Sequence, residues 1–242
     1  MSGDHDRVEH EPALRRGSFA PDPSENTTYV TPDTPTEIDA LRDSVSSEPH
    51  LGDGKGHFGS WLAERRRQTS PAGNLGATLL AALAGGPFAI IGAFVAGQSG
   101  LTGAIYVVVF GPVIEELLKQ SGMIYLLERQ PYRVFSAWQF VAVAAASAII
   151  FAGIENLLYI HVYASQSDIA NLELFARFRW TVCTALHVSC AIVASLGLVR
   201  VWRAQLADGA PADLSHAYPL FVTAMIIHGC YNLVAMLFSD IF

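Results

Sequence analysis

Charge is scarce in this sequence and is unevenly distributed. Only 15% of the 242 residues are charged, and most of the acidic residues precede residue 60. Long stretches after residue 74 carry almost no charge, and the mean hydropathy is +0.33. This pattern is typical of an acidic soluble tail joined to a polytopic membrane domain. No basic patch indicates a nucleic-acid partner, and there is no internal repeat of the kind found in many transporters.

The sequence has few cysteines and no pattern of a cleavable signal peptide at its N-terminus. The three cysteines, Cys183, Cys190 and Cys230, lie in apolar segments, and an odd, buried set does not suit a disulfide framework. We therefore interpret them as packing residues. The N-terminus lacks the basic and apolar regions of a cleavable signal peptide, so we expect the first internal apolar segment to direct membrane insertion.

The first part of the chain divides into two segments. Residues 1–56 are rich in Asp, Glu, Ser, Thr, Pro and Gly, a composition that predicts a disordered tail. Residues 57–74 differ in character, because Phe58, Trp61 and Leu62 share an apolar helical face. Arg65–Arg67 follow directly. This segment is interpreted either as an interfacial helix on an anionic leaflet or as a basic flank that fixes topology. Both interpretations place the tail in the cytoplasm.

Residues 75–242 contain the membrane domain. Five apolar segments are each about as long as a helix that crosses the hydrocarbon core. They are Leu75–Gly97, Leu101–Leu127, Trp138–Ile160, Trp180–Trp202 and Ala217–Phe238. The sequence therefore predicts an all-α fold, a polytopic transmembrane helix bundle of about five spans.

Arginines predict how this bundle is oriented. If all five segments cross the membrane, most of the arginines that flank them fall on one side, namely Arg65–Arg67, Arg129, Arg133, Arg200 and Arg203. The loops on the other side contain Arg177 and Arg179. Because positively charged loops stay in the cytoplasm, we expect a multi-pass protein of the cell membrane with a cytoplasmic N-terminus and an external C-terminus.

Eight polar side chains lie inside four of the predicted spans. They are Glu115, Glu116, Lys119, Glu155, Asn156, His187, His228 and Asn232. Polar groups at membrane depth face the interior of a helix bundle and pair with one another. Glu115 and Lys119 are four residues apart, as are His228 and Asn232, so each pair shares a helical face. The eight side chains together predict one shared polar site.

Gly111-Pro112 interrupts the second span just before the two glutamates. A proline there lacks the N–H that would bond the carbonyl near Val108, so it bends the helix. The bend either opens a polar pocket beside the glutamates or is a tolerated kink.

Four short motifs occur in a fixed order along the predicted spans. They are Glu115-Glu116-Leu-Leu-Lys119, Phe151-Ala-Gly-Ile-Glu155-Asn156, Ala-Leu-His187, and His228-Gly-Cys-Tyr-Asn232. In residues 75–238 the chain thereby resembles the PrsW-type intramembrane proteases. The related CAAX-processing and bacteriocin-immunity proteases share the double glutamate and a His-x-x-x-Asn. They differ from this chain at Gln120, where they have arginine, and at Glu155, where they have histidine. The resemblance implies an intramembrane endopeptidase that cleaves membrane-anchored proteins or peptides.

Peptide hydrolysis requires an activated water and stabilisation of the tetrahedral oxyanion. Glu115 or Glu116 is the candidate base, Lys119 supports one of them, and His228 and Asn232 would contact the water or the oxyanion. In a metal-dependent version Glu155, His187 and His228 supply three ligands for a divalent metal such as zinc and leave a fourth position for water. Asn156 and Asn232 also suit a role as interhelical hydrogen-bond donors.

Two other functions use similar residues. A proton-coupled transporter places Glu, Lys and His within its helices, and a non-catalytic membrane scaffold would recruit a partner through the acidic tail. The partners expected for the protease are a membrane-anchored protein substrate and membrane lipid, with no nucleic acid. The sequence indicates neither the substrate's identity nor an oligomeric state.

Overall fold

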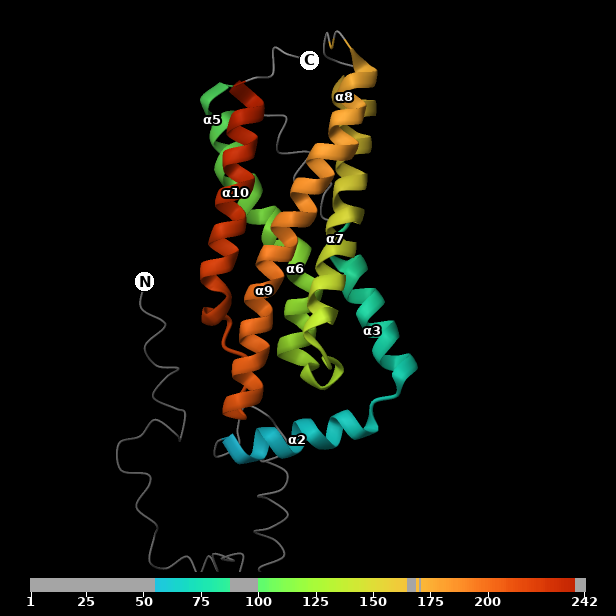
Figure 1. Ribbon diagram of the computed structural model, residues 1–242, viewed down its shortest axis with the longest axis vertical. Coiled ribbons are helices and arrows are strands. Elements are labelled where there is room, and N and C mark those ends of the chain that lie inside the picture. The colour runs from blue at the N-terminus through green and yellow to red at the C-terminus, as the bar shows by residue number, and fades with distance from the viewer. Residues whose placement is uncertain (1–54, 88–99, 165–168, 170, 238–242) are drawn as a thin grey trace, which may run out of the picture. The chain divides into compact units, whose positions relative to one another are not determined.

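The computed structural model describes residues 55–87, 100–164, 169 and 171–237. These residues are almost entirely helical and include no strand, which confirms the predicted all-α class (Figure 1). The expected disordered tail lies outside the described residues, apart from its last two positions. The end of the first predicted span, residues 88–97, also lies outside them.

Four helical segments are long and apolar enough to cross a membrane. They correspond to the second to fifth predicted spans and are Leu101–Arg129, Ala137–Tyr163, Leu172–Asp208 and Leu214–Leu237. The first predicted span overlaps a shorter apolar helix, α3 (Pro71–Ala84), which begins before it and ends where Gly85 forms its C-cap. A further helix, α2 (Lys55–Gln68), precedes it.

All four long segments change helical type along their length. The first consists of α5 (Gly100–Ile105), the π-helix η2 (Tyr106–Phe110) and α6 (Gly111–Arg129). The second consists of α7 (Ala137–Leu158) and the π-helix η4 (Tyr159–Tyr163). The third consists of α8 (Leu172–Phe178), the π-helix η6 (Arg179–Cys183) and α9 (Thr184–Asp208). The fourth begins with the 3-10 turn η7 (Leu214–Ala217) and continues as α10 (Tyr218–Leu237).

The helices begin where the sequence supplies caps. Ser70 accepts a hydrogen bond from the backbone N–H of Gly73 at the start of α3, and Ser136 accepts one from Gln139 at the start of α7. Such caps satisfy backbone donors that a helix cannot satisfy itself. Fully buried apolar side chains, among them Met123, Leu127, Phe140, Leu198 and Ala224, then join α6, α7, α9 and α10 in one core.

Helix α2 lies across one end of the bundle (Figure 1). Its Phe58 and Leu62 are buried, and the Trp61 ring makes an edge contact with Tyr132 in the 3-10 turn η3 (Pro131–Arg133). The Arg66 guanidinium donates a hydrogen bond of 2.8 Å to the Val134 carbonyl. The apolar face predicted for this segment therefore packs against the connection between α6 and α7.

Contacts at the same end bring the arginine clusters together. Arg133 donates a 2.6 Å hydrogen bond to the carbonyl of Gly73, which follows the α2 arginines in sequence. Gln205, two residues after Arg203, donates to the Leu127 carbonyl near Arg129. The arginines predicted to share one side of the membrane thus gather at one end of the bundle.

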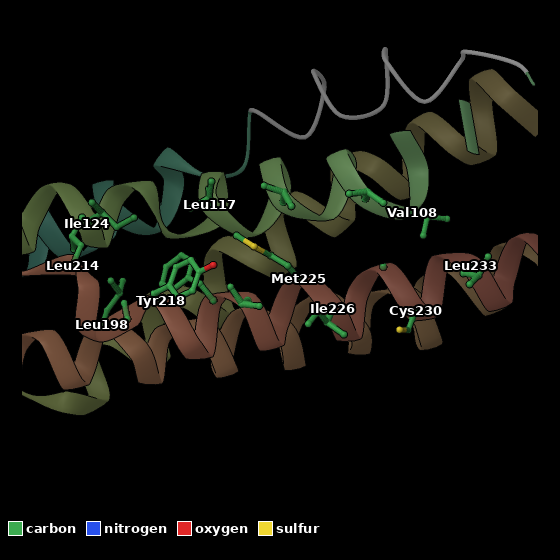
Figure 2. A pocket seen from close by; sticks show the side chains of 16 residues that line it. Val108, Leu117, Ile124, Leu198, Leu214, Tyr218, Met225, Ile226, Cys230 and Leu233 are labelled. Carbon is green, nitrogen blue, oxygen red and sulfur yellow. The ribbon is translucent and has the colours of Figure 1, made fainter. Parts of the chain in front are cut away.

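An apolar groove of about 690 Å³ runs between α6 and α10, with Leu198 of α9 at one end. Figure 2 shows Val108, Leu117 and Ile124 on one wall and Met225, Ile226 and Leu233 on the other. Leu117, Ile226 and Leu233 are exposed, so the groove opens on the surface that faces the bilayer.

Candidate active site

Four helices bring six of the eight predicted polar residues into one continuous network. α6 supplies Glu115, Glu116 and Lys119, α7 supplies Glu155, α9 supplies His187 and α10 supplies His228. All six are buried. The sequence-based expectation of a shared polar site corresponds to this arrangement.

The network is centred on the Lys119 ammonium. Lys119 Nζ donates to Glu116 Oε1 at 2.7 Å, contacts His187 Nδ1 at 2.7 Å and lies 3.6 Å from Glu115 Oε2. It also lies 4.6 Å from the centre of the Phe151 ring, and that ring packs against the His187 ring. Phe151, the aromatic residue of the second motif, therefore forms the apolar wall of the site.

Each histidine has one nitrogen held by a carboxylate. His187 Nε2 lies 2.9 Å from Glu155 Oε2, and His228 Nδ1 lies 2.9 Å from Glu116 Oε1. Because a carboxylate accepts hydrogen bonds, we assign the N–H of each neutral imidazole to that nitrogen. This assignment leaves a lone pair on His187 Nδ1, where Lys119 donates, and another on His228 Nε2.

These two lone-pair nitrogens face Glu115. Glu115 Oε2 lies 3.8 Å from His187 Nδ1 and 3.7 Å from His228 Nε2. These separations exceed hydrogen-bond length, and the buried oxygen has no hydrogen-bond partner among the described residues. Glu115, His187 and His228 offer ligand atoms that all lie within 4.8 Å of one another, which makes them a candidate metal site.

This candidate ligand set differs from the one inferred from sequence at one position. The sequence interpretation placed Glu155 with the two histidines, whereas the structure places Glu115 there. The reason is geometric: Glu155 Oε2 is bonded to His187 Nε2, on the side of the ring that faces away from Glu115. Glu155 thus holds the imidazole of His187 in a fixed orientation through its Nε2.

Arg179 is a site residue that the sequence analysis assigned to a loop. Its Nη2 donates to Glu155 Oε2 at 2.8 Å, and its Nε donates to Asn156 Oδ1 at 3.1 Å. The guanidinium carbon lies 3.9 Å from the centre of the Tyr159 ring. The signal that could have identified Arg179 is its position immediately before the apolar segment Trp180–Trp202.

The two asparagines bond backbone carbonyls of π-helical segments. Asn156 Nδ2 donates to the Arg179 carbonyl at 3.1 Å, and Asn232 Nδ2 donates to the Val107 carbonyl at 2.9 Å. In η2 the Gly111 N–H bonds the Tyr106 carbonyl five residues earlier, so the next bond in that register would join Pro112 to Val107. Proline has no N–H, and Asn232 supplies the missing donor. These contacts fit the interhelical hydrogen-bond role that the sequence left open.

One known family matches most of the chain. The model of a family described as PrsW family intramembrane metalloprotease matches residues 70–242. The chain belongs to this family. No curated protein and no solved structure matches it.

Membership in the PrsW family confirms several sequence-based predictions. The protein is a membrane peptide hydrolase, and its four long apolar helices indicate a multi-pass membrane protein. The family implies membrane-anchored substrates in a lipid environment. All four motifs from which the resemblance was drawn lie within the matched residues.

Proposed function

We propose that this PrsW protein cleaves peptide bonds of membrane-anchored proteins. In this proposal Glu115 is the reactive carboxylate, and Glu115, His187 and His228 hold a divalent metal such as zinc. The observation that carries the proposal is the state of Glu115 Oε2. This oxygen is buried, has no hydrogen-bond partner among the described residues and faces a lone-pair nitrogen of each histidine. A buried carboxylate oxygen in that state is expected to receive a partner from outside the chain.

The ligand set fits a divalent metal. One carboxylate and two imidazoles form the protein ligands of known catalytic zinc sites, with a fourth position for water or substrate. Ligand atoms about 2.1 Å from a tetrahedral ion lie about 3.4 Å apart. The observed 3.7 and 3.8 Å between Glu115 Oε2 and the two nitrogens are close to that separation, and all three ligand atoms lie within 4.8 Å of one another. The second nitrogen of each histidine is already held by a carboxylate, as is usual for metal-binding histidines.

Lys119 is the side chain that must adjust when a cation binds. Its ammonium and the cation compete for the same lone pair on His187 Nδ1. Glu116 keeps a second hydrogen bond to Lys119, so the ammonium has a partner after it leaves His187. Lys119 is therefore a supporting residue that balances the charges of the two glutamates.

Glu115 and Glu116 have different roles in this proposal. Glu116 uses Oε1 for both Lys119 and His228, so it positions those two groups. Glu115 Oε2 makes no hydrogen bond to a described residue, and we assign the proton transfer to Glu115. Its Oε1 accepts a proton from the attacking water and releases it to the nitrogen of the departing amine. A divalent metal at the site supplies Lewis-acid polarisation of the carbonyl and acidification of a bound water.

The test compares glutamate variants in proteoliposomes that contain a single-span, membrane-anchored substrate. Glu115→Gln is expected to lower the cleavage rate by a factor of about 10²–10⁴, as for the loss of a general base, and to remove the bound metal. Glu116→Gln should retain metal and lose about 10–100-fold in rate, because it acts through His228 and Lys119. Glu128→Gln is the matched control, since Glu128 is exposed on the same helix.

Two measurements decide the outcome, the cleavage rate and the metal content of the purified protein. If Glu115→Gln cleaves the substrate as fast as the unmodified protein, Glu115 is not the reactive carboxylate and the proposal is wrong. If Glu115→Gln is inactive but keeps a full complement of metal, the ligand assignment is wrong.

We also propose that the end of the bundle that carries α2 faces the cytoplasm. The arginine clusters that gather there support this orientation through the preference of positive charge for the cytoplasmic side. The C-terminal end of α10 is then external, and Arg179 lies toward the external side of the site.

A further inference from the structure

Tyr106 is a partly buried tyrosine that no predicted motif includes. It is the first residue of the π-helix η2, close to the outer end of its span. Its hydroxyl is buried and has no hydrogen-bond partner among the described residues. A tyrosine that anchors a helix at the membrane surface keeps its hydroxyl in the wet headgroup region, so this tyrosine does not fit that role.

The π-helix places Tyr106 near Glu115. The two residues are nine positions apart, which is about two and a half turns of an α-helix and would put them on opposite faces. In η2 the Gly111 N–H instead bonds the Tyr106 carbonyl five residues back, so one additional residue is accommodated in the turn. The added residue rotates Tyr106 toward the face that carries Gly111 and Glu115.

Gly111 shows how near the two side chains are. A Cβ atom at Gly111 would lie 3.7 Å from Tyr106 Cε1 and 3.8 Å from Glu115 Oε1. The ring edge and the carboxylate oxygen therefore border the same small space, which the absence of a side chain at Gly111 leaves open.

We infer that Tyr106 is a further catalytic residue, whose hydroxyl donates a hydrogen bond to the substrate carbonyl oxygen as that oxygen becomes the tetrahedral oxyanion. The inference rests on the proposed function, because it requires that peptide hydrolysis takes place at Glu115. The tyrosine keeps its proton throughout, and the proton of the water still passes through Glu115. An unpaired buried donor beside the reacting carboxylate is available to an oxyanion without prior breakage of a hydrogen bond within the protein.

The experiment measures steady-state cleavage by Tyr106→Phe in proteoliposomes. Phenylalanine keeps the ring that lies against Gly111, so bound metal and the unfolding temperature should be unchanged. Loss of one oxyanion donor lowers kcat by a factor of about 10²–10³, and KM should stay within about twofold. Tyr125→Phe, on the exposed side of α6 in the same span, is the matched control and should cleave at the unmodified rate.

A second measurement separates an oxyanion donor from a structural tyrosine. A peptide phosphonate that mimics the tetrahedral intermediate should bind Tyr106→Phe about 10²-fold more weakly, in parallel with kcat. The inference is overturned if Tyr106→Phe retains full kcat, if it loses metal, or if phosphonate affinity is unchanged while kcat falls. Glu115→Gln is assayed in the same series: full cleavage by that variant refutes the proposed function, whereas an inactive Glu115→Gln beside a fully active Tyr106→Phe refutes only the role of Tyr106.

Discussion

Arg179→Met tests whether the buried ion pair between Arg179 and Glu155 is held as the structure indicates. Arg179 and Glu155 form a 2.8 Å ion pair whose side chains are 12% and 11% exposed. Two residues earlier, Arg177 on α8 pairs with Glu173 at 2.6 Å, but both of those side chains are 75% exposed. The two pairs have the same chemistry and nearly the same length, and they differ in burial.

Burial sets the expected magnitude. Removal of one partner from a buried ion pair costs about 3–5 kcal/mol, because the remaining charge stays desolvated and unpaired. Arg179→Met also removes a hydrogen bond to Asn156 and the contact with the Tyr159 ring. We therefore expect a loss of about 3–5 kcal/mol in the free energy of unfolding. Arg177→Met removes an exposed helical pair and should cost about 0.5 kcal/mol or less.

The assay is reversible unfolding in mild detergent, completed as a double-mutant cycle with Glu155→Gln. In the double variant residue 155 is a neutral glutamine, so no unpaired charge stays buried. The loss in the free energy of unfolding of the double variant should therefore be about 1.5–3 kcal/mol smaller than the sum of the two single losses. Additive losses, or equal losses for Arg177→Met and Arg179→Met, would show that Arg179 does not hold Glu155 in the membrane.

Two further predictions concern helix packing and orientation. The first is that Gly229→Ala would place a Cβ against the Val108 carbonyl oxygen and should lower the free energy of unfolding by about 1–3 kcal/mol. In the control variant, Gly153→Ala, the added Cβ meets no atom within 4 Å and should be tolerated. The same unfolding assay compares the two variants. The second prediction uses a Cys230→Ser background, in which a membrane-impermeant thiol reagent should label Glu173→Cys in intact cells and Ala63→Cys only after permeabilisation. Both positions are exposed, and their helices, α8 and α2, lie at opposite ends of the bundle (Figure 1). The reverse labelling pattern would invert the proposed orientation.

Much of the fold and of the site's membership could be predicted from the sequence. Apolar segments of membrane-spanning length are easily read because lipid requires every backbone group to be satisfied within a helix. Glutamates and histidines inside such segments are equally visible because their burial is costly. That cost also explains why residues from four separate helices could be placed in one site before any distance was known.

The arrangement within the site could not be predicted, because it depends on which atom of each side chain faces which neighbour. Residue spacing could not show that Glu155 holds the far nitrogen of His187 while Glu115 faces the near one. Arg179 was counted with the loop arginines because the fourth predicted span began at Trp180. In the structure the helix continues without interruption from Leu172 to Asp208, which brings Arg179 to Glu155.

Tyr106 shows a more general limit of helical periodicity. Face assignments from sequence assume 3.6 residues per turn, and one π turn invalidates them for every residue on its far side. The sequence did contain a cue, since Gly111-Pro112 predicts a disturbed helix before the two glutamates. Pro112 removes a backbone donor, Asn232 replaces it at Val107, and the turn between them is wide enough to bring Tyr106 toward Glu115. We therefore interpret the disturbed helix at Gly111-Pro112 as a feature that changes which residues face the site, and not as a tolerated kink.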